Sequence, residues 1–476
     1  MGDSAGAGIL LDDWGLCGAR LLGRLPAFTL SKGQSVLREP KGASESAVDE
    51  SPLGARENGV IWTIWWTYGA FYFCRTNIAA AVPGLKAPLE DGGLGLDAAY
   101  VGLILASLKM AYGLGQLLNG QLAERYKPRK LLAVGMLGSA LLNVVFGFST
   151  AAYFLLFVWA SNGYAQSLGW TPSVRVLANW IPVRHRGRAM GIVGTGYQVT
   201  LGLSFLLAGT SAEYLGWRAA MYIPAVVLAV SAVWMLVTLE DSPPEVDPSG
   251  ASESVGQAAA TATASPEGEP RHSWRENLAG TLSNRALWLM GLSLGLLNAS
   301  RYGFIDWGMA HLIEVQDGGI GRTAIKYAVL PVGAIFGSYF AGWASDRFFG
   351  SRRAPMIVIL LLGLSVSTLA YAEVARTSVP ATIVLLGIIG FCIYGPQVLL
   401  VGTAPSDLAK RGTAAAAAGF VNFMGYMGAA SGDIITGSVL DQDPIGGWQT
   451  AIYIWAGWSL AAACTSALLW NAMARD

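Results

Sequence analysis

The sequence predicts an all-α integral membrane protein whose twelve transmembrane helices form two pseudo-symmetric six-helix halves. The 476-residue chain is 53% hydrophobic and only 13% charged, whereas soluble domains carry about 25% charged residues. The apolar residues gather in twelve segments, most of them long enough to cross a bilayer. A long polar stretch divides these segments six and six, and sequence motifs of the first half recur in the second.

The predicted spans can be given by residue number from the N-terminus onward. They cover residues 60–84, 98–122, 130–149, 152–178, 187–210, 217–239, 285–314, 323–345, 354–373, 379–404, 412–437 and 449–472.

Four parts of the chain follow from these spans. Residues 1–58 are polar and mixed, and we expect a disordered cytoplasmic tail, with a transit peptide as the alternative. The two six-helix halves are then 59–240 and 285–476. Between them, residues 241–284 have the Ser, Ala, Gly and Glu composition of a flexible linker.

Charge in the loops predicts the orientation. Basic clusters at 125–130, 184–188, 347–353 and 410–411 fall in loops on one side of the predicted bundle. The opposite loops are poor in basic residues. By the positive-inside rule, both termini and the linker are expected on the cytoplasmic side, in a plasma (inner) membrane or an organelle membrane.

Several classes of protein are disfavoured. The formal net charge is zero, so no overall field attracts nucleic acid. No nucleophile–base pair and no phosphate-cradling glycine loop indicates an enzyme, and no cofactor is expected. We expect a monomer in the bilayer. Cysteines and histidines show no spacing typical of disulfide frameworks or metal sites; they stand at Cys17, Cys74, Cys392, Cys464, His185, His272 and His311.

An arginine interrupts the first apolar segment. Arg75 lies within the predicted span 60–84, where a charged side chain costs at least about 2.5–3.5 kcal/mol on insertion scales. Tyr68, Tyr72 and Arg75 follow at i, i+4 and i+7, which places them on one face of a continuous helix. Such a face can cradle an anion.

An internal repeat supplies a second arginine. Glu124 and Asp346 occupy matching loops 222 residues apart, and Arg75 and Arg301 lie 226 residues apart. Each half therefore carries one arginine at an equivalent place on its first helix. Two such cations facing a central cavity repel each other unless a dianion such as a phosphate monoester lies between them.

The alternative is that each arginine pairs with a buried acid. Asp306 and Asp433 are the clear intramembrane acids. Asp306 lies five residues after Arg301, so we expect its side chain to point away from that arginine.

Two loops with the pattern Gly-x-x-x-(Asp/Glu)-Arg resemble the major facilitator superfamily, at 120–130 and 342–353. The blocks 68–77, 301–307 and 412–420 narrow the resemblance to the organophosphate:phosphate antiporter family. The resemblance implies a carrier that exchanges an organic phosphate for inorganic phosphate by rocking its halves about a central site. It implies that Arg75 and Arg301 bind the phosphoryl group. Further residues implied to line the cavity are Tyr68, Tyr72, Tyr112, Gln166 and Tyr394.

The sequence departs from the family at the cavity. Tyr197 stands where glycerol-3-phosphate transporters have a histidine, Gln116 where they have a lysine, and Pro331 near a glutamate position. Lys109 is a candidate to restore positive charge, because it shares a helix face with Tyr112; the alternative is that it faces an aqueous vestibule or snorkels.

Four acidic residues are candidates for coupling or gating. Glu124 and Asp346 are expected to act as latches between helices. Asp433 is open to three interpretations: a partner of Lys109, a partner of an arginine, or a proton carrier. Asp306 completes the set.

Two other functions are compatible with the sequence. A proton-coupled symporter for an organic anion or phosphonate is one. A transporter-like sensor of sugar phosphates is the other, although neither the tail nor the linker shows a recognisable interaction motif.

Overall fold

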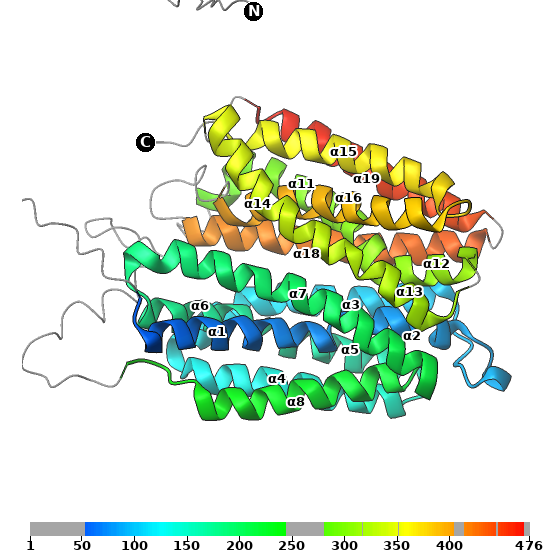
Figure 1. Cartoon of the computed structure of the whole chain (residues 1–476), viewed down its shortest axis with the longest axis horizontal. Helices are drawn as coiled ribbons and strands as arrows, with labels where there is room; N and C mark the ends of the chain where they lie inside the picture. The colour runs from blue at the N-terminus through cyan, green and yellow to red at the C-terminus, as the bar shows by residue number, and fades with distance from the viewer. Residues whose placement is uncertain are drawn as a thin grey trace, which may run out of the picture. The chain divides into compact units, whose positions relative to one another are not determined.

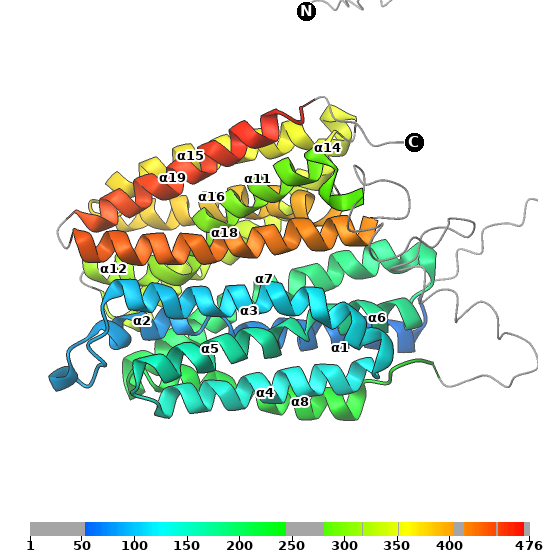
Figure 2. The ribbon, with the colours of Figure 1, turned by 180° about the vertical axis from the view of Figure 1, so that it is seen from behind.

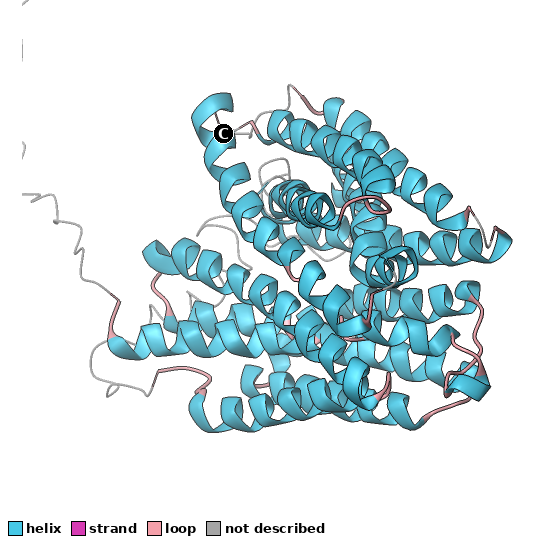
Figure 3. Ribbon diagram, turned by 45° about the vertical axis from the view of Figure 1, so that its right-hand side comes forward, coloured by secondary structure: helices cyan, strands magenta, loops and turns pink. Residues whose placement is uncertain are grey.

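The structure, a computed structural model, describes residues 53–243, 280–316, 318–350, 352–403, 414–443 and 446–470. Every regular element in these ranges is a helix (Figure 3). Most of the predicted tail and linker lies outside them. The first helix begins at Ala55, inside the tail predicted to end at residue 58. The reason is local: the Glu57 side chain accepts a hydrogen bond from the Gly54 N–H and caps the helix start.

The first half comprises six spans, of which spans 1 and 4 are each made of more than one helix. Its elements are α1 (Ala55–Ala70), η1 (Phe71–Cys74), α2 (Ile78–Lys86), η2 (Leu89–Asp91), α3 (Ala98–Arg125), α4 (Pro128–Phe148), α5 (Ala152–Ser167), α6 (Trp170–Trp180), α7 (Val183–Leu215) and α8 (Ala219–Thr238).

The second half repeats this plan, with spans 7, 8 and 10 divided. Its elements are α11 (Arg285–Tyr302), the π-helical turn η3 (Gly303–Trp307), α12 (Gly308–Gln316), α13 (Ile320–Tyr327), α14 (Val329–Phe349), α15 (Arg353–Val374), α16 (Val379–Val398), the π-helical turn η4 (Leu399–Thr403), α18 (Ala414–Gln442) and α19 (Gly447–Ala467).

Within the described residues, all twelve predicted spans are mainly helical, and their ends differ from the prediction by a few residues. In the part of the chain that the structure describes, seven helical stretches are by themselves long and apolar enough to cross a membrane. The main error concerns span 1, because the predicted continuous α-helix ends at Ala70. A 3-10 turn and residues 75–77 follow before the helix resumes at Ile78.

The break in span 1 is stabilised by amide side chains, because a lipid-embedded chain must satisfy its backbone groups internally. Asn143 and Asn162 both donate to the Cys74 carbonyl oxygen, at 3.2 and 2.9 Å. Gln166 donates to the Phe71 carbonyl oxygen at 3.0 Å. Specific hydrogen bonds from other helices of the first half therefore stabilise the break.

Each half packs two of its helices through a glycine. On α5, a Cβ at Gly163 would collide with the Leu108 carbonyl of α3. On α16, a Cβ at Gly390 would collide with the Leu330 carbonyl of α14. Small residues let membrane helices approach closely, and the repetition confirms the relation between the halves.

The two halves meet mainly along α3 and α18 and along α7 with α13 and α14 (Figures 1 and 2). Asp441 at the end of α18 accepts hydrogen bonds from the N–H groups of Ala98 and Ala99 at the start of α3, both at 2.8 Å. At the same end of the bundle, Lys86 pairs with Glu314 at 3.1 Å. This end is the one predicted to face away from the cytoplasm.

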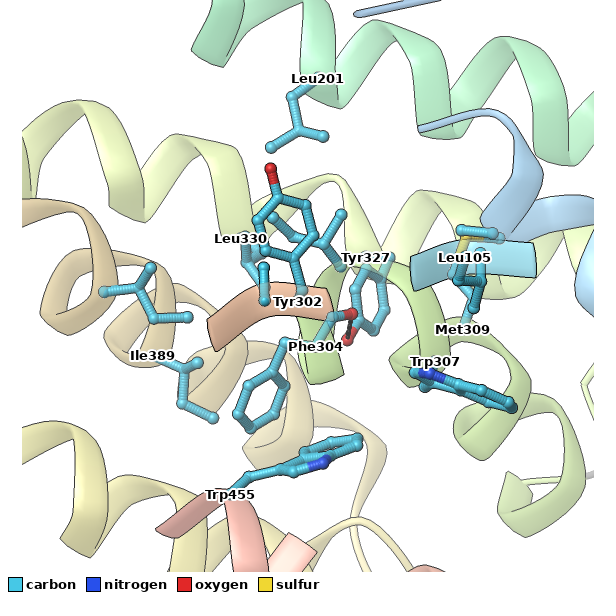
Figure 4. Packing of buried hydrophobic residues seen from close by; sticks show 14 of the residues in the cluster. Leu105, Leu201, Tyr302, Phe304, Trp307, Met309, Tyr327, Leu330, Ile389 and Trp455 are labelled. Atoms are coloured by element: carbon cyan, nitrogen blue, oxygen red, sulfur yellow. Dashed lines mark hydrogen bonds between the residues drawn. The ribbon is translucent and has the colours of Figure 1, made fainter. Parts of the chain in front are cut away.

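Aromatic side chains fill the core of the second half. Figure 4 shows Phe304 and Trp307 of span 7 packed among side chains of neighbouring helices, including Tyr327 and Trp455. The Tyr327 hydroxyl donates to the Phe304 carbonyl oxygen at 2.6 Å. The π-helical turn η3 is thus held in place directly after Arg301.

Candidate functional site

Arg75 lies within the break in span 1, directly after the 3-10 turn η1, and is 4% exposed. Its Nε donates to Oε1 of Gln166 at 3.0 Å. Its guanidinium lies over the rings of Tyr72 and Tyr112, 4.6 and 4.5 Å from their centroids. Among the described residues, neither Nη1 nor Nη2 has a hydrogen-bond partner. Four of the five N–H donors of this buried guanidinium are therefore unused within the described residues.

Arg301 is the counterpart in the second half and is 3% exposed. Its Nη2 donates to the Tyr394 hydroxyl at 3.1 Å. The rings of Tyr302 and Tyr394 each lie 4.8 Å from its guanidinium carbon. Its Nε finds no hydrogen-bond partner in the described part of the chain.

Stacked tyrosines connect the surroundings of the two arginines. The ring of Tyr72 stacks on Tyr197 at 5.2 Å, and Tyr197 lies 6.3 Å from Tyr394. Tyr72 contacts Arg75 and Tyr394 contacts Arg301. The predicted residues from both halves are therefore gathered at one place in the bundle.

The last of the predicted lining residues, Tyr68, also belongs to this group. Tyr68 packs against Tyr72 and Tyr197 at 6.2 and 6.1 Å. Thus Tyr68, Tyr72 and Arg75 stay together although the helix between them is broken, because the 3-10 turn keeps Tyr72 beside Tyr68. The expected continuous helix was wrong, but Tyr72 contacts both Tyr68 and Arg75, so the three side chains lie together.

The prediction missed three aromatic residues of the site. Tyr426 on α18 packs against Tyr112 at 4.5 Å, and Trp170 on α6 packs against Tyr68 at 4.8 Å. Tyr302 lies under Arg301. Tyr302 and Trp170 were detectable, because they stand in the family-like motifs at 301–307 and 169–172; Tyr426 had no such signal.

Lys109 does not join the arginines. Its Nζ contacts carboxylate oxygens of both Asp306 and Asp433. Among the three interpretations of Asp433, pairing with Lys109 is the one the structure contains. Lys109 thus has two acidic partners, and its positive charge is already compensated where we expected it to serve an anion.

Two departures from the family pattern lie near this region. Gln116 donates a long hydrogen bond, at 3.4 Å, to the Ser167 carbonyl. Pro331 of α14 packs beside Gly202 of α7, so it takes part in the contact between halves.

The two loop acids differ in what can be described. Asp346 near the end of α14 accepts a hydrogen bond from Arg353 at the start of α15, at 2.7 Å. The side chain of Glu124 lies outside the described residues.

Both guanidiniums have only neutral hydrogen-bond partners in the described part of the chain, Gln166 and Tyr394. The alternative that each arginine pairs with a buried acid is therefore not what the structure contains. Asp306, as expected, turns to Lys109 and not to Arg301. Two buried cations that have free N–H donors and no carboxylate hydrogen-bonded to them in the described residues form an anion site by their chemistry.

Two six-helix halves, a polar site between them and broken helices at that site define a membrane transporter of the secondary carrier type. Residues 64–433 match the family model described as Major Facilitator Superfamily. The chain belongs to this superfamily, whose members are transporters and not enzymes, and it is a multi-pass integral membrane protein.

Curated relatives narrow the family further. A probable hexose phosphate transport protein of Chlamydia trachomatis is 29% identical over 424 residues, covering 87% of this chain and 91% of that protein. A glycerol-3-phosphate transporter of Bacillus subtilis is 30% identical over 421 residues, covering 85% and 90%. The predicted membership of the organophosphate:phosphate antiporter family is thereby confirmed.

One further relative has a different role in its name. The membrane sensor protein UhpC of Escherichia coli is 28% identical over 415 residues, covering 84% of this chain and 89% of that protein.

Solved structures support the fold. A bacterial homologue of the human lysosomal transporter Spinster, in an inward-facing and occupied conformation, superposes with a TM-score of 0.69. The match covers 88% of this chain and 97% of that one at 16% identity.

Proposed function

We propose that the protein exchanges an organic phosphate, such as a sugar phosphate or a glycerol-3-phosphate-like compound, for inorganic phosphate by alternating access. The phosphoryl group is held between Arg75 and Arg301. The observation that carries the proposal is the pair of buried guanidiniums with unused donors and neutral partners. The substrate class follows the names of the hexose phosphate and glycerol-3-phosphate relatives.

The chemistry of the arginines favours a phosphoryl group over other anions. Each unsatisfied buried donor costs about 1–3 kcal/mol, and a dianion supplies acceptors for several donors at once. Its two negative charges balance the two guanidiniums. The planar fork of arginine matches the tetrahedral oxygens of phosphate in a bidentate manner.

The tyrosines around the arginines serve substrate binding and positioning. Their hydroxyl groups supply neutral hydrogen bonds that do not compensate the positive charge, and their rings hold the guanidiniums in place. The rest of the substrate would contact walls that differ from those of glycerol-3-phosphate carriers, at Tyr197 and Gln116.

The proposed orientation places both termini, the linker 241–284 and the basic loops in the cytoplasm, with the protein acting as a monomer. With this orientation, the end where Asp441 meets the start of α3 faces away from the cytoplasm.

Transport is tested with purified protein in liposomes loaded with labelled phosphate. External hexose phosphate or glycerol 3-phosphate is expected to release the label, and an empty liposome gives the background. If neither these compounds nor triose phosphates or phosphonates release label, the proposal is wrong.

The arginine assignment has its own test. Arg75→Lys and Arg301→Lys each keep the charge but lose the bidentate fork. We expect each variant to lose at least about tenfold in exchange rate, because one good charged hydrogen bond contributes about 1.5–3 kcal/mol. Membrane expression and the size-exclusion profile are checked for both. Wild-type exchange by both lysine variants would contradict the assignment.

A sensor function is the second candidate, favoured by the likeness to UhpC. It predicts binding of a sugar phosphate with no exchange in the same liposomes.

A further inference from the structure

Three buried charges link the two halves next to the arginine site, because the Tyr302 ring lies 4.8 Å from both Lys109 Nζ and the Arg301 guanidinium carbon. Lys109 of α3 contacts Asp306 of η3 and Asp433 of α18, and each of the three side chains is at most 3% exposed. We call these three residues the ion triad. The lysine belongs to the first half and both aspartates belong to the second.

The charges of the ion triad do not cancel. One ammonium group faces two carboxylates, so the fully ionised triad has a net charge of −1 in a buried position. Both carboxylates contact the same Nζ atom, which places them next to each other. Buried like charges are costly, and here the lysine between them is what compensates the repulsion.

We propose that the Asp306–Asp433 pair is a proton-binding site for which Lys109 and a proton compete. When the halves separate along α3 and α18, Lys109 leaves with the first half. Two adjacent carboxylates then remain in the second half, and one takes up a proton from water because the pair cannot stay doubly ionised at low cost. When the halves close, Lys109 returns and the proton goes back to water.

The ligand of this site is a proton, and its binding follows the separation of α3 from α18. This proton site does not depend on which substrate is transported and is separate from the proposed exchange reaction. The equilibrium between the separated and the closed arrangement of the halves then depends on pH. Acid favours the separated halves, and alkaline conditions favour the closed contact.

Other groups near the triad have partners of their own. The ring of Tyr302 lies 4.8 Å from Lys109 Nζ. The hydroxyl of Tyr327 is bonded to the Phe304 carbonyl, and His311 is bonded to Tyr371. Other ionisable groups on the elements packed against the triad include Asp97, Tyr100, Tyr112, Arg125, Lys86, Arg285, Arg301, Glu314, Tyr426 and Asp441.

These remaining groups do not share the triad's bonds. Lys86 and Glu314 pair with each other at the exposed end of the bundle. Asp441 accepts from backbone N–H groups, and Arg301 donates to Tyr394. Among the described residues, the aspartate pair is thus the place where two buried carboxylates share one cation.

The separation of the halves is measured with two spin labels on the full chain in lipid nanodiscs, without phosphate. The labels are attached at Leu89→Cys and Gln442→Cys, two exposed positions in different halves. Cys17 and the exposed Cys464 are replaced by serine. Electron–electron distances are recorded between pH 5.5 and pH 8.5.

The ratio of separated to closed molecules is expected to rise as the pH falls, by up to about tenfold per pH unit, the limit for one linked proton. A distance distribution that does not change with pH overturns the proposal. This wild-type result stands whether or not a variant folds.

A matched pair of variants localises the effect. Asp433→Asn leaves one carboxylate with Lys109, so the pH dependence is expected to disappear. Glu314→Gln removes a contact between halves that is exposed and contains no carboxylate pair, and it is expected to keep the wild-type pH dependence. Wild-type pH dependence in a folded Asp433→Asn variant overturns the assignment, and so does its loss in Glu314→Gln.

The experiment is independent of transport. Because no phosphate is present, a failure of phosphate exchange in liposomes leaves the spin-label result unaffected. Conversely, exchange of organic phosphate with no pH effect on the distances refutes only the proton site.

Discussion

Replacing Gln166 by glutamate tests whether the charge of Arg75 must stay uncompensated. The change is nearly isosteric, and it puts a carboxylate oxygen where the amide oxygen now accepts from Arg75 Nε at 3.0 Å. An arginine paired with this carboxylate has less attraction for an incoming anion. We therefore expect Gln166→Glu to bind phosphate and organic phosphates much more weakly than the wild type.

The magnitude follows from Coulomb's law. A carboxylate roughly 6 Å from a bound dianion repels it by about 5 kcal/mol at an effective dielectric constant of 20. About half of this value already weakens binding by about a hundredfold. The expected result is a dissociation constant for phosphate at least about a hundredfold higher.

Loss of the amide N–H₂ group has a separate effect. Gln166 also donates to the Phe71 carbonyl and to Ser139 Oγ, so glutamate leaves the Phe71 carbonyl without this donor at a cost of about 1–3 kcal/mol. We expect a lower melting temperature together with the weaker binding.

A matched control separates the two effects. Asn119 is a fully buried amide that donates to Ser167 Oγ at 2.6 Å and does not contact Arg75. Asn119→Asp introduces a buried carboxylate of the same kind, and we expect it to affect stability more than phosphate affinity. Binding is measured with labelled phosphate on detergent-purified protein with a wild-type size-exclusion profile. If Gln166→Glu binds phosphate as tightly as the wild type, the uncompensated-arginine argument is wrong.

Two further predictions concern positioning and packing. Tyr394→Phe removes the hydroxyl that accepts from Arg301, and we expect phosphate affinity to fall about threefold to tenfold, for a hydrogen bond of about 0.5–1.5 kcal/mol; unchanged affinity would show that this hydroxyl does not position the arginine. Gly390→Ala places a methyl group against the Leu330 carbonyl, and we expect a clear fall in melting temperature. Gly457→Ala is the control, because no atom lies within 4 Å of a Cβ at that position. We expect this control to have the melting temperature of the wild type.

The fold was accessible from the sequence because the bilayer imposes length and composition on each span. The repeat located Arg301 from Arg75 by offset alone, and the structure places both in one tyrosine cluster. The break after Ala70 was not predicted. Residues 71–77 remain apolar enough to read as helix, and the amide side chains that stabilise the break come from α4 and α5, 66 or more residues away.

The pairing of Lys109 with both aspartates could also not be predicted from the sequence. Helix periodicity placed Lys109 on the face of Tyr112, which fits a role beside the arginines. The competing carboxylates lie 197 residues away at Asp306 and still further along at Asp433. Only the packing of α3 against η3 and α18 decides that these three charges meet.

The amide bonds around the break in span 1 have a mechanical consequence. Arg75 is tied through Gln166 to α5, and the neighbouring Cys74 carbonyl is tied to α4 and α5, so this guanidinium travels with the first half as one solid piece. Arg301 is tied to Tyr394 and travels with the second. The distance between the two guanidiniums therefore depends on the tilt between the halves. An anion that binds both guanidiniums stabilises the tilt at which their separation matches the size of the anion.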